Sequence, residues 1–196
     1  LPCPGSACGT ASRCDGGAAR RDALMHHRLL LVPAMAIVAA QYAPAYELQT
    51  LEEAQQRLYP NAKLTPFEFK LAPEQFTQLK FEYKVPAFRP LFRGWKVEGG
   101  GWLYIDQVYG LNDIVTYLVA IGADGKCRGI EVLTCADGYC DLYTPQWRNT
   151  LVGLEHGRWD PTRTVPMVSG STLSATHVAE GVKKMLAVHA RYRPQP

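Results

Sequence analysis

The fold of this chain is decided by the stretch YLVAIGADGKCRGIEVL, residues 117–133. Two apolar runs, residues 114–121 and 128–133, flank an Asp124-Gly125 pair, which between β-rich runs is the strongest short hairpin signal in the sequence. A second hairpin is predicted just upstream, where residues 94–97 and 102–108 flank three consecutive glycines, Gly99 to Gly101. Consecutive hairpins predict an antiparallel sheet.

Helices are predicted before and after these strands. Residues 48–58 have the apolar spacing of a short amphipathic helix, residues 65–71 are extended, and residues 73–79 form a helix with proline in its first turn. Near the C-terminus, five residues share one helix face: Val178, Val182, Met185, Leu186 and His189. The predicted fold class is therefore α+β, an antiparallel β-sheet flanked by helices and closed by a C-terminal helix.

The N-terminal part of the sequence has the pattern of an export signal. Residues 1–24 show no periodicity and are interpreted as a disordered or wrongly assigned leader. Residues 25–45 then combine a short basic head, about a dozen apolar residues and the small residues Ala43-Pro44-Ala45, as a signal peptide does. We expect cleavage near Ala45 and a periplasmic or otherwise exported protein. A membrane anchor, which needs about 20 apolar residues, is the alternative.

The remaining chain is nearly neutral and suits one domain. Residues 1–45 hold four of the 21 basic and two of the 18 acidic side chains. No basic field remains that would attract nucleic acid, so nucleic acid is not an expected partner. Residues 46–87 form an N-terminal segment of helical and extended parts, and residues 88–196 form the principal predicted domain.

The candidate site is the run Ser169-Gly170-Ser171-Thr172-Leu173-Ser174, which precedes the C-terminal helix. Small hydroxyl residues around a glycine allow a tight turn. At a helix N-terminus the first backbone N–H groups lack intrahelical partners and carry partial positive charge, so a phosphate binds there readily. The alternative is that the run is an ordinary helix cap.

The same run resembles the S-G-A-T-x-[ST] signature of the FMN-binding domain family, which includes the C subunit of the sodium-pumping NADH:quinone oxidoreductase and the G subunit of the Rnf complex. The resemblance extends over residues 114–190, because the D-G-K turn and the following strand are similar to that family's core hairpin. It implies an FMN-binding-domain-like fold in which Thr172 carries FMN through a phosphoester, flanked by the other five residues of the motif. Ser171 replaces the usual alanine, and Pro166 replaces a common aspartate. Non-covalent FMN in the same turn is the alternative.

The resemblance implies an electron-transfer protein, with a flavin transferase as its maturation partner and a membrane or exported redox partner. No catalytic acid/base pair is evident, so a stand-alone enzyme is not predicted. The alternatives are a non-flavin binding or structural module on the same fold and a flavin-dependent reductase with its own small substrate. Tyr143 and Trp147 are candidates to stack on the flavin ring, although ordinary packing is the alternative.

Three cysteines follow the predicted cleavage site: Cys127, Cys135 and Cys140. In an oxidising compartment the closely spaced Cys135 and Cys140 are expected to form a disulfide. The alternatives are a redox-active pair and a metal site, but the spacing is not Cys-x-x-Cys and no histidine-rich segment lies nearby, so no metal site is predicted.

Overall fold

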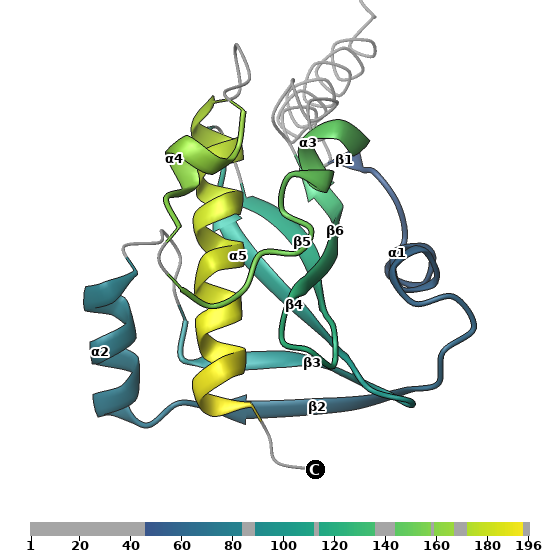
Figure 1. The fold of residues 1–196 in the computed structure, drawn as a ribbon, viewed down its shortest axis with the longest axis horizontal. Coiled ribbons are helices and arrows are strands. Elements are labelled where there is room, and N and C mark those ends of the chain that lie inside the picture. Colours follow the sequence, from purple (N-terminus) through teal and green to yellow (C-terminus); the bar gives the residue numbers. More distant parts are fainter. Residues whose placement is uncertain are drawn as a thin grey trace, which may run out of the picture. The chain divides into compact units, whose positions relative to one another are not determined.

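The computed structural model describes residues 46–83, 89–111, 114–135, 144–157, 159–166 and 172–193, all within the unit Pro44–Pro196. These residues form one antiparallel sheet in the order β1-β6-β5-β4-β3-β2, with helices on both faces (Figure 1). The strands are β1 (Tyr46–Glu47), β2 (Leu64–Lys70), β3 (Leu91–Val97), β4 (Trp102–Tyr109), β5 (Ile114–Ile121) and β6 (Cys127–Cys135). The helices are α1 (Leu51–Leu58), α2 (Pro73–Glu82), α3 (Pro145–Asn149), α4 (Pro161–Thr164) and α5 (Thr172–Tyr192). The α+β class is confirmed.

Both predicted hairpins are confirmed. β3 pairs with β4 across Gly99, Gly100 and Gly101, which have φ angles of 87°, 104° and 117°. Such angles strain residues with a side chain, so the turn needs its glycines. β5 pairs with β6 across a turn in which Gly125 has φ 79° and the Asp124 carboxylate accepts the Lys126 N–H at 3.1 Å.

The predicted helices form with small shifts in their ends. α1 begins at Leu51, three residues after the start of the predicted pattern, because Thr50 and Glu53 form a capping box in which each side chain accepts the other's backbone N–H. α2 begins at Pro73 as predicted and runs to Glu82, three residues beyond the predicted end. The extended segment became β2, which pairs with β3 along its whole length. The segment 46–87 therefore contributes two strands, β1 and β2, to the same sheet as the strands that follow it.

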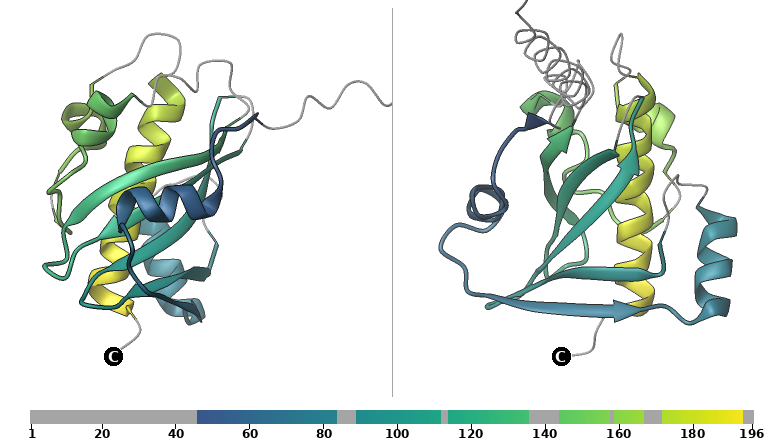
Figure 2. Two further views of the ribbon diagram at one scale, coloured as in Figure 1. Left: turned by 90° about the vertical axis from the view of Figure 1, so that its right-hand side faces the viewer. Right: turned by 180° about the vertical axis from the view of Figure 1, so that it is seen from behind.

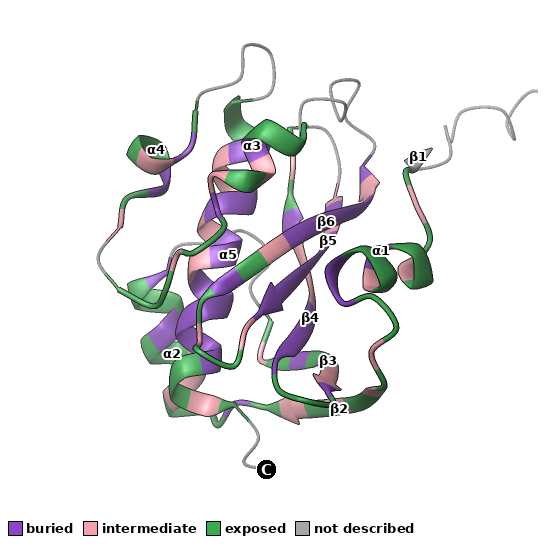
Figure 3. Ribbon diagram, turned by 45° about the vertical axis from the view of Figure 1, so that its right-hand side comes forward, coloured by how far each residue is buried: buried purple, intermediate pink, exposed green. Residues whose placement is uncertain are grey.

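Two hydrophobic layers pack against the two faces of the sheet. On one face, α5 covers the larger core, to which Tyr104 and Tyr117 of the sheet and Val182 and Met185 of the helix contribute. On the other face, Ala54 and Leu58 of α1 pack on Leu103 and Leu118. Figure 2 shows α1 and α5 on opposite sides of the strands, and Figure 3 shows buried residues along α5 and the central strands.

Each edge of the sheet is protected from pairing with another chain. At the β2 edge, the backbone groups of Lys63 and Leu71 form hydrogen bonds on the β3 side. Backbone hydrogen-bonding directions alternate along a strand, so Pro66 has its backbone nitrogen on the outer side. Because proline has no N–H, the edge there has one donor fewer. At the other edge, the Leu48 N–H donates to the Leu133 carbonyl, and Cys127 exchanges hydrogen bonds with residues 153 and 154. Unpaired strand edges otherwise promote aggregation. Within the described residues, no helix is both long and apolar enough to cross a membrane.

Candidate functional site

The candidate site lies at the N-terminal end of α5. The helix begins at Thr172, within the motif rather than after it as predicted, and Thr172 is exposed. Leu173 is 45% exposed, whereas Ser174 is buried. Ser169, Gly170 and Ser171 lie outside the described residues, so their backbone geometry remains a prediction. The described half of the motif thus places one exposed threonine at a helix terminus.

Two hydrogen bonds attach this end of α5 to the end of β4. The Ser174 hydroxyl accepts the Leu111 N–H at 2.9 Å. One turn along the helix, His177 Nδ1 lies 2.7 Å from the Tyr109 carbonyl oxygen. A carbonyl can only accept, so Nδ1 carries the proton and donates in this contact. Thr172 therefore stands on a helix terminus that is fixed to the sheet.

The electrostatics at this terminus favour an anion. α5 has 21 residues, and its first turn contains no acidic side chain. The first carboxylate along the helix, Glu180, is partly buried; burial raises its pKa, while His177 and Lys183 oppose that rise. The positive end of the helix dipole at Thr172 is thus not neutralised by an acid on its own first turn.

The middle of α5 is attached to the sheet by a buried polar triad of Lys184, Asp106 and Tyr117. Lys184 Nζ lies 2.9 Å from Asp106 Oδ1 and 2.7 Å from Oδ2, and the Tyr117 hydroxyl donates to Oδ2 at 2.6 Å. Only 1% of the lysine side chain and 14% of the aspartate side chain are exposed. Gly181 permits this approach, because a Cβ there would overlap the Tyr117 hydroxyl. The triad fixes the helix but lies too deep for the lysine to reach a ligand in solvent.

The C-terminal part of α5 has a second polar attachment, between His189 and Tyr104. His189 Nδ1 lies 2.9 Å from the Tyr104 hydroxyl, and Arg193 Nη1 lies 3.4 Å from Nε2. Arginine can only donate, so Nε2 accepts and Nδ1 carries the proton of a neutral imidazole. Burial, with a smaller contribution from Arg193, lowers the pKa of His189 to about 4. His189 is thus a neutral core residue, in agreement with its place on the predicted apolar face of the helix.

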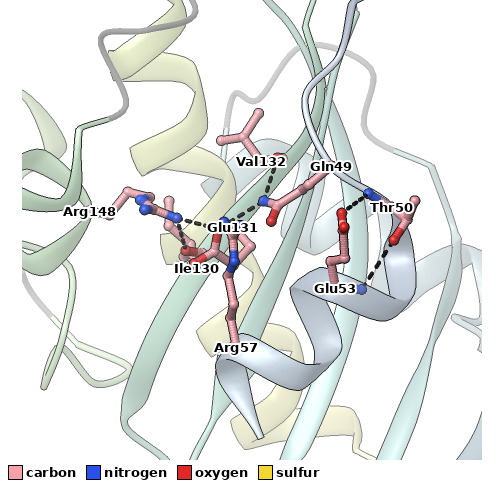
Figure 4. A network of polar contacts seen from close by, with 8 residues as sticks. All are labelled: Gln49, Thr50, Glu53, Arg57, Ile130, Glu131, Val132 and Arg148. Atoms are coloured by element: carbon pink, nitrogen blue, oxygen red, sulfur yellow. Dashed lines mark hydrogen bonds and ion pairs between the residues drawn. The ribbon is translucent and has the colours of Figure 1, made fainter. Parts of the chain in front are cut away.

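On the opposite face of the sheet, Glu131 is the centre of a polar network (Figure 4). Its carboxylate forms ion pairs with Arg148 of α3 and, at 3.7 Å, with Arg57 of α1. Gln49 donates to Glu131 Oε2 and to the Val132 carbonyl, both at 2.8 Å. This network joins α1, α3 and the outer edge of β6. A carboxylate with that many partners acts as a structural connector rather than as a free acid or base.

The described cysteines differ in state. Cys127 is a free thiol, 1% exposed, and burial raises its pKa to about 12. Cys135 is fully buried and disulfide-bonded. Cys140 lies outside the described residues, so the Cys135–Cys140 pairing itself remains a prediction. Within the described parts of the chain, no three His, Cys, Asp or Glu side chains gather as a metal site would require.

The structure describes one of the two aromatic candidates for flavin stacking. Trp147 of α3 is 3% exposed and belongs to the core beneath α5, which is the ordinary packing that was the alternative. Tyr143 lies outside the described residues. Trp147 is therefore not available at the surface to cover a ring at Thr172.

The sequence pattern could have predicted the buried ion pair of the triad. Side chains alternate between the two faces of β4, and Asp106 is on the same face as the buried Trp102, Tyr104 and Val108. The pattern therefore places a charged residue at a core position. Its partner, Lys184, precedes the buried Val188 by four residues and so shares its side of the helix.

Comparison of the sequence with protein-family models and with curated proteins finds no match.

Proposed function

We propose that this chain is an exported FMN-binding electron-transfer protein whose flavin is linked by a phosphoester to Thr172. The observation that carries the proposal is the position of Thr172, an exposed threonine at the first residue of a 21-residue helix with no acid in its first turn. The resemblance of residues 114–190 to the FMN-binding domain family, and the export signal, add to it.

The residues present fit a phosphate group. The positive end of the helix dipole favours a dianion at this end of α5. Thr172 supplies the oxygen that a phosphoester requires, and Ser174, bonded to Leu111, keeps the helix start in place. His177 donates to a carbonyl and adds no negative charge. Thr172 would hold the phosphate with Ser169, Gly170, Ser171 and Leu173 around it.

When bound, FMN would supply the redox chemistry, accepting and donating electrons between a membrane or exported donor and its acceptor. The protein would retain and orient it. Covalent attachment keeps a flavin from diffusing away, which matters in an exported compartment. A flavin transferase would be needed for maturation.

Two other functions compete with this proposal. With Pro166 in place of the aspartate that the transferase recognises, FMN could be bound non-covalently, or the chain could be a non-flavin binding or structural module on a related fold. A flavin-dependent reductase with its own small substrate is the remaining candidate. The resemblance is to electron-carrying subunits, so electron transfer is favoured over catalysis.

The test is to purify the exported protein from cells that contain its flavin transferase, denature it, and measure flavin fluorescence on the protein band. We expect fluorescence in the wild type, none in Thr172→Val, and unchanged fluorescence in Thr176→Val, a matched control one turn along the same helix. A yellow protein that releases FMN on denaturation would overturn only the phosphoester. A colourless protein from a competent host would overturn the proposal.

A further inference from the structure

The sheet face that carries α1 is only partly covered. α1 packs on β5 and β6, and the turn after it reaches the glycine-turn end of β3 and β4. None of the described helices lies over the opposite end of β3 and β4, where Leu91 and Arg93 are exposed and Trp95, Ile105 and Gln107 are half-buried. Figure 2 shows α1 crossing the strands on this face, with α5 behind them.

Two adjoining hollows lie on this uncovered part of the sheet. One, of about 520 Å³, is lined by Pro66, Trp95 and Ile105, and the other, of about 200 Å³, by Arg89, Leu91 and Gln107. Arg93 and Ile105 line both, so the two adjoin. We call them together the β3–β4 hollow. The larger part lies within the range of about 300–1,000 Å³ that is typical of small-molecule sites.

The β3–β4 hollow combines a flat apolar floor with positive charge. Trp95 and Ile105 supply apolar surface, and a half-exposed indole offers a face on which an aromatic ring can stack. Arg89 and Arg93 are among its lining residues. Of the described lining residues, Glu68 and Asp106 carry carboxylates, and Glu68 bonds to Arg93 Nε at 2.5 Å.

Asp106 contributes to the lining, but its carboxylate is held by Lys184 and Tyr117 on the other face. Among the described residues the hollow thus carries an excess of positive charge. A planar aromatic ring bearing a carboxylate complements both features, because guanidinium groups bind carboxylates through paired N–H donors.

We propose that the β3–β4 hollow binds a small aromatic carboxylate, with its ring against Trp95 and Ile105 and its carboxylate on Arg93 and Arg89. This site is independent of the flavin proposal, because it lies on the face of the sheet opposite α5. Glu68 competes with the ligand for Arg93, and it therefore sets the affinity of the hollow.

The test is calorimetric titration of the purified full chain with 2-naphthoate, and with its uncharged analogue 2-naphthamide as the matched ligand. We expect saturable 1:1 binding of 2-naphthoate, weaker binding of the amide, and quenching of tryptophan fluorescence that disappears in Trp95→Phe. Replacing one exposed charged partner is expected to change affinity about two- to fivefold.

Two charge variants are expected to change the affinity for 2-naphthoate in opposite directions. Arg93→Gln should weaken 2-naphthoate binding, whereas Glu68→Gln should strengthen it by releasing Arg93. Arg163→Gln, on the exposed α4, is the matched control and should leave affinity unchanged. Absence of saturable binding, equal affinity for the amide, or an Arg93→Gln variant that binds like wild type would overturn the proposal. A thermal melt of each variant establishes that it is folded.

Discussion

Lys184 of α5 and Asp106 of β4 form an ion pair across 78 residues of sequence, with 1% of the lysine side chain exposed. Burying two charges is costly, and each is tolerated only because the other compensates it. The Tyr117 hydroxyl adds a third member on β5. The pair therefore fixes the helix that begins at Thr172 to the centre of the sheet.

Removal of one partner should cost more stability than removal of both. Lys184→Met leaves a largely buried carboxylate, and we expect the free energy of unfolding to fall by about 2–4 kcal/mol. Lys184→Met with Asp106→Asn should lose less, because the amide oxygen still accepts from Tyr117 without an unpaired charge. Urea denaturation of the two single variants and the double variant measures the coupling. Additive losses would contradict the ion pair.

Gly181 is predicted to be required for packing rather than for backbone conformation. In an ordinary helix, Gly→Ala gains about 1 kcal/mol. Here the new Cβ would overlap the Tyr117 hydroxyl and lie 3.0 Å from Val108 Cγ1, so we expect Gly181→Ala to destabilise by about 1–3 kcal/mol.

Tyr117→Phe removes the overlapping oxygen and supplies the control for Gly181. In that background the cost of Gly181→Ala should shrink, which denaturation of all four proteins would measure. An equal cost in both backgrounds would place the strain elsewhere.

Local features of the fold were predictable from sequence, and long-range ones were not. The Asp124-Gly125 turn, the glycine turn at residues 99–101 and the apolar face of α5 follow from residues close together in the chain. The pairing of β2 with β3 and the Glu131 network depend on contacts between distant segments. An extended segment such as residues 65–71 does not specify which strand it joins.

The candidate site was predictable to a similar degree. Small residues before an apolar run predict a helix start near the motif, although the helix begins inside it, at Thr172. The attachment of Ser174 to the Leu111 N–H does not, because it joins segments 63 residues apart through a single backbone group. The β3–β4 hollow was also missed, since it is formed by residues of three strands that are distant in the sequence.

Thiol counting tests the predicted disulfide. Cys127 is buried and its pKa is raised to about 12, so the native protein should not react with a thiol reagent at neutral pH. After denaturation without reductant, the mature chain should show one reactive thiol if Cys135 is bonded to Cys140. Cys127→Ser should then show none. Three thiols in the denatured wild type would refute the disulfide.

Stability should fall as the pH is lowered from about 6.5 to about 4, because of His189. Its pKa is about 4 in the folded state and about 6.5 when unfolded, so the unfolded chain binds the proton first. The contribution of the neutral imidazole is therefore complete above pH 6.5 and is lost as the pH approaches 4. The whole effect is at most about 3 kcal/mol.

The contacts of His189 explain why its pKa is lowered in the folded protein. Protonation of Nε2 would replace its contact with Arg193 by a repulsion between two cations, in a position where water is excluded. Glutamine can still hydrogen-bond to Tyr104 but does not titrate, so His189→Gln should flatten the pH dependence between 4 and 6.5. His156→Gln, in an exposed loop, is the control and should leave the slope as it is. Urea unfolding at half-unit pH steps measures all three proteins, and an unchanged slope in His189→Gln would assign the proton uptake to another group.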